Sequence, residues 1–220
     1  MNINLVFEDN YVIVCQKPPG IPVETAKVGI IDMVSELRNY VNDKTGNSYL
    51  GVVHRLDQPV EGVMVFAKNQ FAAAGLSKQI SLNKMKKYYL AVLCGEPTRK
   101  EDTLVDYLVK NGRINVSTIV DKSIAGAKKS ELIYKIVASK DQLSLAEIEL
   151  ITGRHHQIRV QMANVNLPLW GDVKYNHEFL DQRGVAPALC AYKLEFVHPK
   201  TNKIMKFEIE PSGEMFKLFQ

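Results

Sequence analysis

The sequence predicts a fold of the α+β class, with a sheet that is mixed but largely antiparallel. Segments with strand-like alternation dominate the 220-residue chain, whereas helical segments are few. The two kinds of segment do not alternate strictly, as they would in a doubly wound parallel sheet. No internal repeat, low-complexity stretch or Ser/Gly-rich linker divides the chain. We therefore expect a single domain over residues 1–220.

The first half of the chain contains strand and helix signals on either side of a proline-rich segment. The expected elements are two strands within 3–16, a helix over roughly 29–42, a strand over 62–67, a helix that carries Phe71, Ala72, Leu76 and Ile80, and a strand over 88–94. Asn69 stands where it can cap the second helix. The segment 17–22 must leave the sheet, because its three prolines lack the N–H that a strand donates.

The second half is richer in strands. Residues 131–137 and 143–150 are expected to pair across the turn signal Ser139-Lys140-Asp141. Residues 153–164 have the spacing of a short helix. A closing hairpin is expected around 199–203, with Leu194 and Phe196 on one strand and Met205, Phe207 and Ile209 on the other.

Composition and charge exclude several classes of protein without selecting one. Hydrophobic residues make up 46% of the chain and charged residues 24%, which is typical of globular domains. No apolar run approaches the ~18 residues of a membrane span, and the first residues do not resemble a secretory signal, so we expect a soluble, cytoplasmic protein. The net charge of +4 permits nucleic-acid binding, but an ordinary solvated surface explains it at least as well.

The three cysteines point to buried, reduced thiols. Cys15, Cys94 and Cys190 are odd in number, widely spaced and form no CxxC pair. Cys15 and Cys94 lie in apolar, strand-like surroundings. We therefore expect neither a redox pair nor a metal site from them.

The segment His54-Arg55-Leu56-Asp57 is the first of three that concentrate polar groups within an apolar pattern. It lies where a strand is expected to end and a loop to begin, a usual place for functional side chains. A salt bridge between Arg55 and Asp57 within the loop is an equally good explanation of this segment alone.

The second segment, 153–162, predicts a cationic start to a helix. Arg154, His155 and Arg159 fall within about two turns and can meet a carboxylate or phosphates. The tandem His155-His156 lacks the further ligand that a metal site needs at helical spacing. A plain basic surface helix remains the stronger reading of this segment by itself.

The third segment, 87–95, carries Tyr88 and Tyr89 on a predicted strand. Alternation places the two rings on opposite faces, so that one can face a cleft while the other packs. Two core tyrosines are the simpler interpretation when the segment is taken alone.

Together, these segments resemble the RluA-type pseudouridine synthase family, in order and over nearly the whole chain. The matching motifs are His54-Arg55-Leu56-Asp57 with Gly62 and Ala67-Lys68, Lys87-x-Tyr89-x-Ala91 with Gly95, Gly153-Arg154-x-His156-Gln157-Ile158-Arg159-Val160, Pro168 with Gly171-Asp172 and Tyr175, Glu8-Asp9 to Lys17-Pro18-x-Gly20, and Leu194-x-Phe196-x-His198-Pro199. Each motif is moderately specific, and their combination is strong. The resemblance implies a two-lobed domain with a long, mostly antiparallel sheet and a central cleft.

The resemblance also implies roles for named residues. Asp57 is expected to be the catalytic carboxylate, Tyr89 to pack on the target base and serve as a possible base, and Arg159 to pair with Asp57. Arg55 is expected to enter the RNA stack where a uridine has been extruded. The remaining expected RNA contacts are His54, Arg154, His156 and Gln157.

The same resemblance implies the partners of the protein and leaves one alternative. The substrate would be ribosomal or transfer RNA, isomerised by a monomer that needs no cofactor and no metal. We expect no S4-like RNA-binding domain of the kind that many relatives carry in front. The alternative is a non-catalytic RNA-binding module that retains the fold. An unrelated hydrolase with an aspartyl nucleophile is disfavoured, because no second acid or oxyanion-hole signature is present.

Five positions depart from the family pattern. They are Val60-Glu61 after the catalytic motif, His155, Gln161 and Asn176. None of them touches Asp57, Tyr89 or Arg159, so we expect the reaction to be retained. They bear on which RNA is used, and Glu61 near the cleft would repel phosphate unless it faces away.

Overall fold

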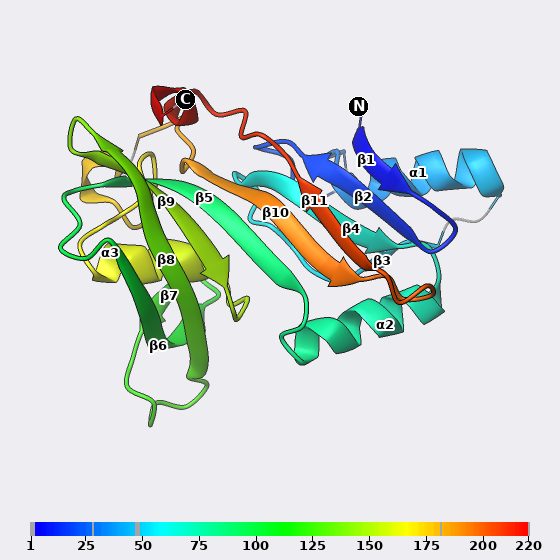
Figure 1. Cartoon of the computed structure of the whole chain (residues 1–220), viewed down its shortest axis with the longest axis horizontal. Helices are drawn as coiled ribbons and strands as arrows, with labels where there is room; N and C mark the ends of the chain where they lie inside the picture. The colour runs from blue at the N-terminus through cyan, green and yellow to red at the C-terminus, as the bar shows by residue number, and fades with distance from the viewer. Residues whose placement is uncertain (1–2, 28, 47–48, 181, 220) are drawn as a thin grey trace. The chain divides into compact units, whose positions relative to one another are not determined.

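The structure is a computed structural model that describes residues 3–27, 29–46, 49–180 and 182–219. These residues form eleven strands, three α-helices and two short 3-10 helices (Figure 1). The chain divides into two compact units, which we describe separately. The first contains Met1–Lys86 and Ala191–Glu210, and the second contains Lys87–Cys190 and Pro211–Gln220.

The first unit is built on a mixed sheet. Its strands are β1 (Asn4–Glu8), β2 (Val12–Lys17), β3 (Gly51–Val52), β4 (Glu61–Ala67), β10 (Leu189–Val197) and β11 (Ile204–Glu208). The order is β1-β2-β4-β10, with β3 on β4 and β11 on β10. The pairs β1–β2, β2–β4, β3–β4 and β10–β11 are antiparallel, while β4 and β10 run in the same direction in Figure 1.

Gly62 permits the close approach of β4 to β10. Its φ of +151° and its position beside Ala191 leave no room for a side chain, since a Cβ there would overlap the side chain and backbone of Ala191. The glycine that follows the Asp57 motif is therefore needed for the fold of the strand that follows the loop.

Two helices complete the first unit, and both begin at a side-chain cap. Helix α2 (Gln70–Ser81) starts where expected, because Asn69 accepts a hydrogen bond from the backbone N–H of Ala72 at 2.9 Å. Helix α1 (Met33–Thr45) begins four residues later than the spacing predicted. Asp32 supplies its cap by accepting from Ser35 N at 2.7 Å, and the residues before it stay outside the helix.

The core of the first unit lies between β2, β4, β10 and α2. Its buried members are Val12, Val14, Val63, Val65, Ala67, Ala72, Leu76, Met85, Leu194 and Phe196. Alternate strand residues and one face of α2 contribute these side chains, as the period of each element requires. This packing gives the loop before β4 a rigid base.

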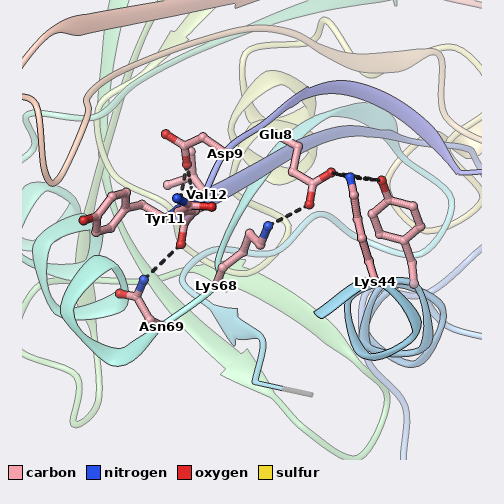
Figure 2. A network of polar contacts seen from close by, with 9 residues as sticks. Glu8, Asp9, Tyr11, Val12, Lys44, Lys68 and Asn69 are labelled. Carbon is pink, nitrogen blue, oxygen red and sulfur yellow. Dashed lines mark hydrogen bonds and ion pairs between the residues drawn. The ribbon is translucent and has the colours of Figure 1, made fainter. Parts of the chain in front are cut away.

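A polar network joins β1, α1 and the residue after β4 (Figure 2). The Glu8 carboxylate accepts hydrogen bonds from Tyr40 at 2.9 Å and from Lys44 and Lys68 at 2.7 Å each. Partial burial raises the pKa of Glu8, but the bonds from Lys44, Lys68 and Tyr40 outweigh it and lower that pKa to about 2. Glu8 is therefore charged at all physiological pH values.

Asp9, the next residue, connects the β1–β2 turn to the β10–β11 hairpin. Its Oδ1 accepts from the backbone N–H groups of Tyr11 and Val12, and its Oδ2 lies 2.8 Å from His198 Nε2. His198 Nδ1 accepts from the backbone of Thr201 at 3.0 Å, so the imidazole must carry its proton on Nε2 and donate it to Asp9.

The second unit is an antiparallel sheet with one covering helix. Its strands are β5 (Lys86–Cys94), β6 (Glu101–Asn111), β7 (Val116–Ile119), β8 (Lys128–Lys140) and β9 (Leu143–Leu150), in the order β5-β9-β8-β6-β7. All four pairings in this order are antiparallel. The remaining elements are α3 (Gln157–Asn164), η1 (His177–Phe179) and η2 (Glu214–Phe219).

Helix α3 is shorter than predicted, because the residues before it are held in a bend. The backbone N–H groups of Ile151 and Thr152 both donate to the Glu131 carbonyl at 3.2 and 3.1 Å. His156 then adopts a left-handed conformation with φ +53° immediately before the helix. The helix consequently begins at Gln157 rather than at residue 153.

The predicted α+β class and the mixed, mostly antiparallel sheet are confirmed, as are the β8–β9 and β10–β11 hairpins. The three cysteines are buried, as expected. Within the described residues, no helix has both the length and the apolar character that a membrane crossing requires. The central cleft and the single catalytic domain stay predictions.

Candidate active site

Asp57 lies in the first unit, in the loop between β3 and β4. Leu56 and Val60 on either side are buried, Asp57 is half-buried and Arg55 is exposed. The carbonyl of Asp57 accepts from Val60 N at 3.0 Å, which closes a tight turn. Buried neighbours and this turn hold the Asp57 backbone in place, whereas the Arg55 side chain extends to the surface.

Lys17 belongs to a recognised motif, but it had no predicted role at the candidate site. Its side chain is fully buried at the end of β2, and its ammonium donates to three backbone carbonyls. The acceptors are Pro18 at 2.9 Å, Ile21 at 2.6 Å and Gln58 at 2.9 Å. Because Gln58 follows Asp57 directly, Lys17 ties the Asp57 loop to the proline-rich segment after β2.

The backbone and side chain of Gln58 strengthen this connection. Gly20 N donates to the Gln58 carbonyl at 2.9 Å, and Gln58 Nε2 donates back to the Gly20 carbonyl at 3.0 Å. Gly20 has φ +84° and so takes a conformation that suits glycine. The motif Lys17-Pro18-x-Gly20 therefore acts as a support for the Asp57 loop.

Two carboxylates face the buried cation. Burial lowers the pKa of Lys17 to about 8, against the attraction of Asp57 and of Glu61, which oppose the shift. Glu61 is itself buried, with 4% of its surface exposed. Glu61 thus lies beside a cation within the first unit, and the expected repulsion of phosphate is reduced.

Tyr89 lies in the second unit, on the inward face of β5. Tyr89 pairs with Ile148 and Ala91 with Ala146, whereas Tyr88 pairs with Glu149 on the other face. Tyr89 is buried and Tyr88 only partly so, as the predicted alternation requires. Lys87, two residues before Tyr89, shares its face.

Arg159 forms a buried ion pair with Asp172 within the second unit. Its Nε donates to Oδ2 and its Nη2 to Oδ1, both at 2.6 Å, in a bidentate arrangement. The side chains are 4% and 0% exposed. The Tyr175 ring lies 5.2 Å from the guanidinium carbon, within cation–π range.

This partner of Arg159 was not predicted. The sequence reading paired Arg159 with Asp57 and gave Asp172 no role, although the Gly171-Asp172 motif was recognised. Asp57 belongs to one unit and Arg159 with Tyr89 to the other. The pairing of Asp57 with Arg159 therefore stays a prediction.

Gln157 organises the bend before α3. Its Oε1 accepts from Thr152 Oγ1 at 2.7 Å and from Arg154 N at 3.0 Å, and its Nε2 donates to the Glu131 carbonyl at 3.1 Å. The side chain is 2% exposed. Its polar groups thus serve the loop that presents Arg154.

His156 is a neutral acceptor in the second unit. Burial, together with the charge of Arg159, lowers the pKa of His156 to about 2. Tyr175 OH accepts from Ser117 N at 2.7 Å and lies 2.9 Å from His156 Nδ1, so the phenol donates its own hydrogen to the imidazole. His156 and Gln157 are therefore anchored within the protein.

The other predicted contacts are placed as follows. His54 Nε2 accepts from Val65 N at 3.1 Å in the first unit, which ties the segment His54-Arg55-Leu56-Asp57 to β4. Arg154 is exposed in the second unit, and its Nε donates to the Lys129 carbonyl at 3.0 Å.

The departures from the family pattern have structural partners. Gln161 Nε2 donates to Asp106 at 2.7 Å, and Asn176 Nδ2 donates to the Leu169 carbonyl at 3.0 Å. The His155 ring lies 3.0 Å from Asn115 Oδ1 and 2.9 Å from Ser117 Oγ, and so links the start of α3 to the β6–β7 hairpin. Each of these three side chains thus forms a local hydrogen bond, although Gln161 Oε1 is buried without a hydrogen-bond partner among the described residues.

Comparison with known proteins identifies the class. The family model described as RNA pseudouridylate synthase matches residues 11–164. An uncharacterized RNA pseudouridine synthase of Helicobacter pylori is 33% identical over 228 residues, covering 99% of this chain and 69% of the relative. The ribosomal large subunit pseudouridine synthase D of Zymomonas mobilis is 31% identical over 231 residues, covering 99% and 72%.

A relative and a solved structure complete the comparison. The ribosomal large subunit pseudouridine synthase C of Yersinia pestis is 32% identical over 212 residues, covering 93% of this chain and 64% of the relative. The solved structure of human RNA pseudouridylate synthase domain containing 4 has a TM-score of 0.82 at 20% identity, covering 97% and 90% of the two chains. This likeness shows a shared fold.

The fold, the motifs and the matches define an RNA-modifying isomerase. The chain belongs to the RNA pseudouridylate synthase family, and its motifs are those of the RluA type.

Proposed function

We propose that this enzyme converts uridine to pseudouridine in large-subunit ribosomal RNA, with Asp57 as its catalytic carboxylate. The observation that supports the role of Asp57 most strongly is the Lys17 ammonium. It binds the loop at Gln58 and places a buried positive charge near Asp57. The choice of ribosomal RNA follows the names of the relatives from Zymomonas mobilis and Yersinia pestis.

The reaction requires an ionised acid at the extruded nucleotide. The glycosidic bond at uracil N1 breaks and a bond at C5 forms, so the base must be held while it is detached. A carboxylate can act as a nucleophile or proton acceptor only in its charged form. At neutral pH Lys17 is largely charged, and its attraction to Asp57 supports that form.

Arg159 is proposed to contact Asp57 and to be oriented for this by Asp172. A guanidinium has five N–H donors, and Asp172 accepts from Nε and Nη2. The donors on Nη1 then point along a direction fixed by the bidentate pair. Tyr89 is proposed to stack on the extruded uracil, a contact worth roughly 1–3 kcal/mol.

Arg55 and Arg154 are the proposed direct RNA contacts. Both are exposed. Extruding a base from its stack costs a few kcal/mol, and insertion of Arg55 would offset part of this cost. For His54, His156 and Gln157, whose hydrogen bonds described above go to protein groups, we propose that they position the loops. A cytoplasmic monomer is the proposed form of the enzyme.

The test is pseudouridine formation by purified protein on an unmodified transcript of large-subunit ribosomal RNA. Pseudouridines would be mapped by primer extension after carbodiimide treatment. We expect a modified position with the wild type and none with Asp57→Asn, which should still bind the transcript. Binding without modification by the wild type would favour a non-catalytic RNA-binding module, and modification of transfer RNA alone would replace the proposed substrate.

A further inference from the structure

The structure contains a fully buried lysine, Lys17, and a partly buried one, Lys87, and their surroundings are opposite in character. In the first unit, the Lys17 ammonium has three carbonyl acceptors and two carboxylate neighbours. In the second unit, Lys87 is partly withdrawn from water. Among the described residues, none forms a hydrogen bond or ion pair with the Lys87 ammonium. Lys17 is thus satisfied by the fold, whereas Lys87 is not.

The charged neighbour of Lys87 is another cation. Burial lowers the pKa of Lys87, and the positive charge of Arg154 lowers it further. The nearest acid along the ladder, Glu149, pairs with Tyr88 and therefore lies on the opposite face of the sheet. Two like charges near each other, one of them desolvated, raise the energy of the protein unless an anion joins them.

The Lys87 ammonium lies next to Gly153, which has no side chain to cover it. Lys87 Nζ lies 3.3 Å from the position that a Cβ would take on Gly153, and Gly153 itself is exposed. A larger side chain at 153 would cover the ammonium. Lys87 is partly exposed, and Arg154, the residue after Gly153, is exposed.

Arg154 is held in place beside this opening. Its backbone N–H donates to Gln157 Oε1, and its Nε donates to the Lys129 carbonyl at 3.0 Å. The terminal Nη groups of the guanidinium are not needed for these two bonds, and they can contact an anion. A fixed guanidinium beside a desolvated ammonium is suited to a tetrahedral oxyanion.

We propose that Lys87 and Arg154 together bind one backbone phosphate of the RNA substrate. This inference rests on the proposed function, because the anion is taken to belong to RNA. Lys87 shares the face of β5 with Tyr89, about 7 Å along the strand. The phosphate is therefore one that flanks the nucleotide stacked on Tyr89. The RNA anion completes a cation pair that the protein leaves unbalanced.

The experiment measures how salt weakens RNA binding, using the full chain with Asp57→Asn so that the RNA is not altered. The probe is the unmodified large-subunit ribosomal RNA transcript, and the variants add Lys87→Met, Lys87→Arg or Lys140→Met. Lys140 is an exposed lysine at the end of β8 and controls for the loss of one surface charge. Filter binding between 50 and 200 mM KCl gives the slope of log affinity against log salt.

Lys87→Met is expected to reduce the magnitude of this slope by about 0.7–0.9, because one phosphate contact is lost. The parent then loses about threefold more affinity than Lys87→Met over this fourfold change in salt. Lys87→Arg should retain the slope of the parent, as should Lys140→Met. Thermal unfolding of Lys87→Met should occur at or above the temperature of the parent, since an unpaired buried charge is removed.

Equal slopes for Lys87→Met and Lys140→Met would overturn the proposal. So would unfolding of Lys87→Met several degrees below the parent, which would make Lys87 a structural cation, or a failure of the parent to bind the transcript. Failure of the proposed function looks different. In that case the enzyme with Asp57 intact forms no pseudouridine, while the slopes still separate Lys87→Met from its controls.

Discussion

Replacing Asp172 by Asn removes the charge that balances the buried Arg159 and should strongly destabilise the protein. The bidentate pair has two bonds of 2.6 Å, and its side chains are 4% and 0% exposed, so solvent cannot replace the lost carboxylate. Charged hydrogen bonds contribute about 1.5–3 kcal/mol each. Breaking a buried pair by removing one partner costs about 3–5 kcal/mol, and we expect a loss in this range.

The prediction can be measured by thermal unfolding and urea titration. For a chain of this size, 1 kcal/mol corresponds to about 2–4 °C, so a loss of 4 kcal/mol lowers Tm by roughly 8–16 °C. The double variant Arg159→Met with Asp172→Leu is the control, because it removes both charges and should be more stable than Asp172→Asn. A loss below about 1 kcal/mol for Asp172→Asn would refute this account of the ion pair.

Two further predictions concern pH. The pKa of Lys17 is lowered from its usual 10.5 to about 8, so activity should fall as pH rises through about 8, when the cation near Asp57 is lost, and Lys17→Met should lack this limb. Between about pH 8 and 10.5 the unfolded chain binds more protons at Lys17 than the native one, so the free energy of unfolding should increase as pH rises across this window. Activity and stability, measured together, test the direction of both changes. The pKa of Glu8 is lowered from 4.5 to about 2, so its contribution is complete above 4.5 and is lost as pH falls through 2. Glu8→Gln should lower the free energy of unfolding by about 1–2 kcal/mol at pH 7, after allowance for solvent screening. The variant should also lose less stability than the wild type when urea titrations are repeated at decreasing acid pH. An equal loss in both proteins would contradict this role.

Much of the fold was predictable because local chemistry and tertiary packing agree. Asn69 caps α2 where expected, and the alternation of β5 separates Tyr88 from Tyr89. Strands β6 and β7 were missed. The burial of β6 alternates irregularly along Glu101–Asn111, and its charged residues hide the apolar pattern of a strand.

The starts of α1 and α3 were placed too early for a different reason. The apolar spacing extends to residues before the true first residue of each helix, and contacts with other parts of the chain decide where the helix starts. Asp32 caps α1 and also accepts from Thr25 N at 3.0 Å, while the Glu131 carbonyl on β8 bends the residues before α3. Neither contact can be read from spacing.

The candidate site was only partly predictable from its residue types. Asp57, Tyr89 and Arg159 lie in segments that the sequence singles out for polar groups among apolar neighbours, and their roles, which the family resemblance implies, stay proposals. Lys17 and Asp172 were recognised within motifs but given no role, since lysine and aspartate usually lie on the surface. Their functions follow from burial and from partners distant in the chain, such as Gln58 for Lys17.

The most direct test of the account is whether the carboxylate of Asp57 is needed for pseudouridine formation in cells. Large-subunit ribosomal RNA would be mapped in cells that lack the gene and in the same cells carrying either the wild type or Asp57→Asn at equal protein levels. We predict that a pseudouridine is lost with the gene and returns with the wild type but not with the variant. Its return with Asp57→Asn would contradict the catalytic role of Asp57.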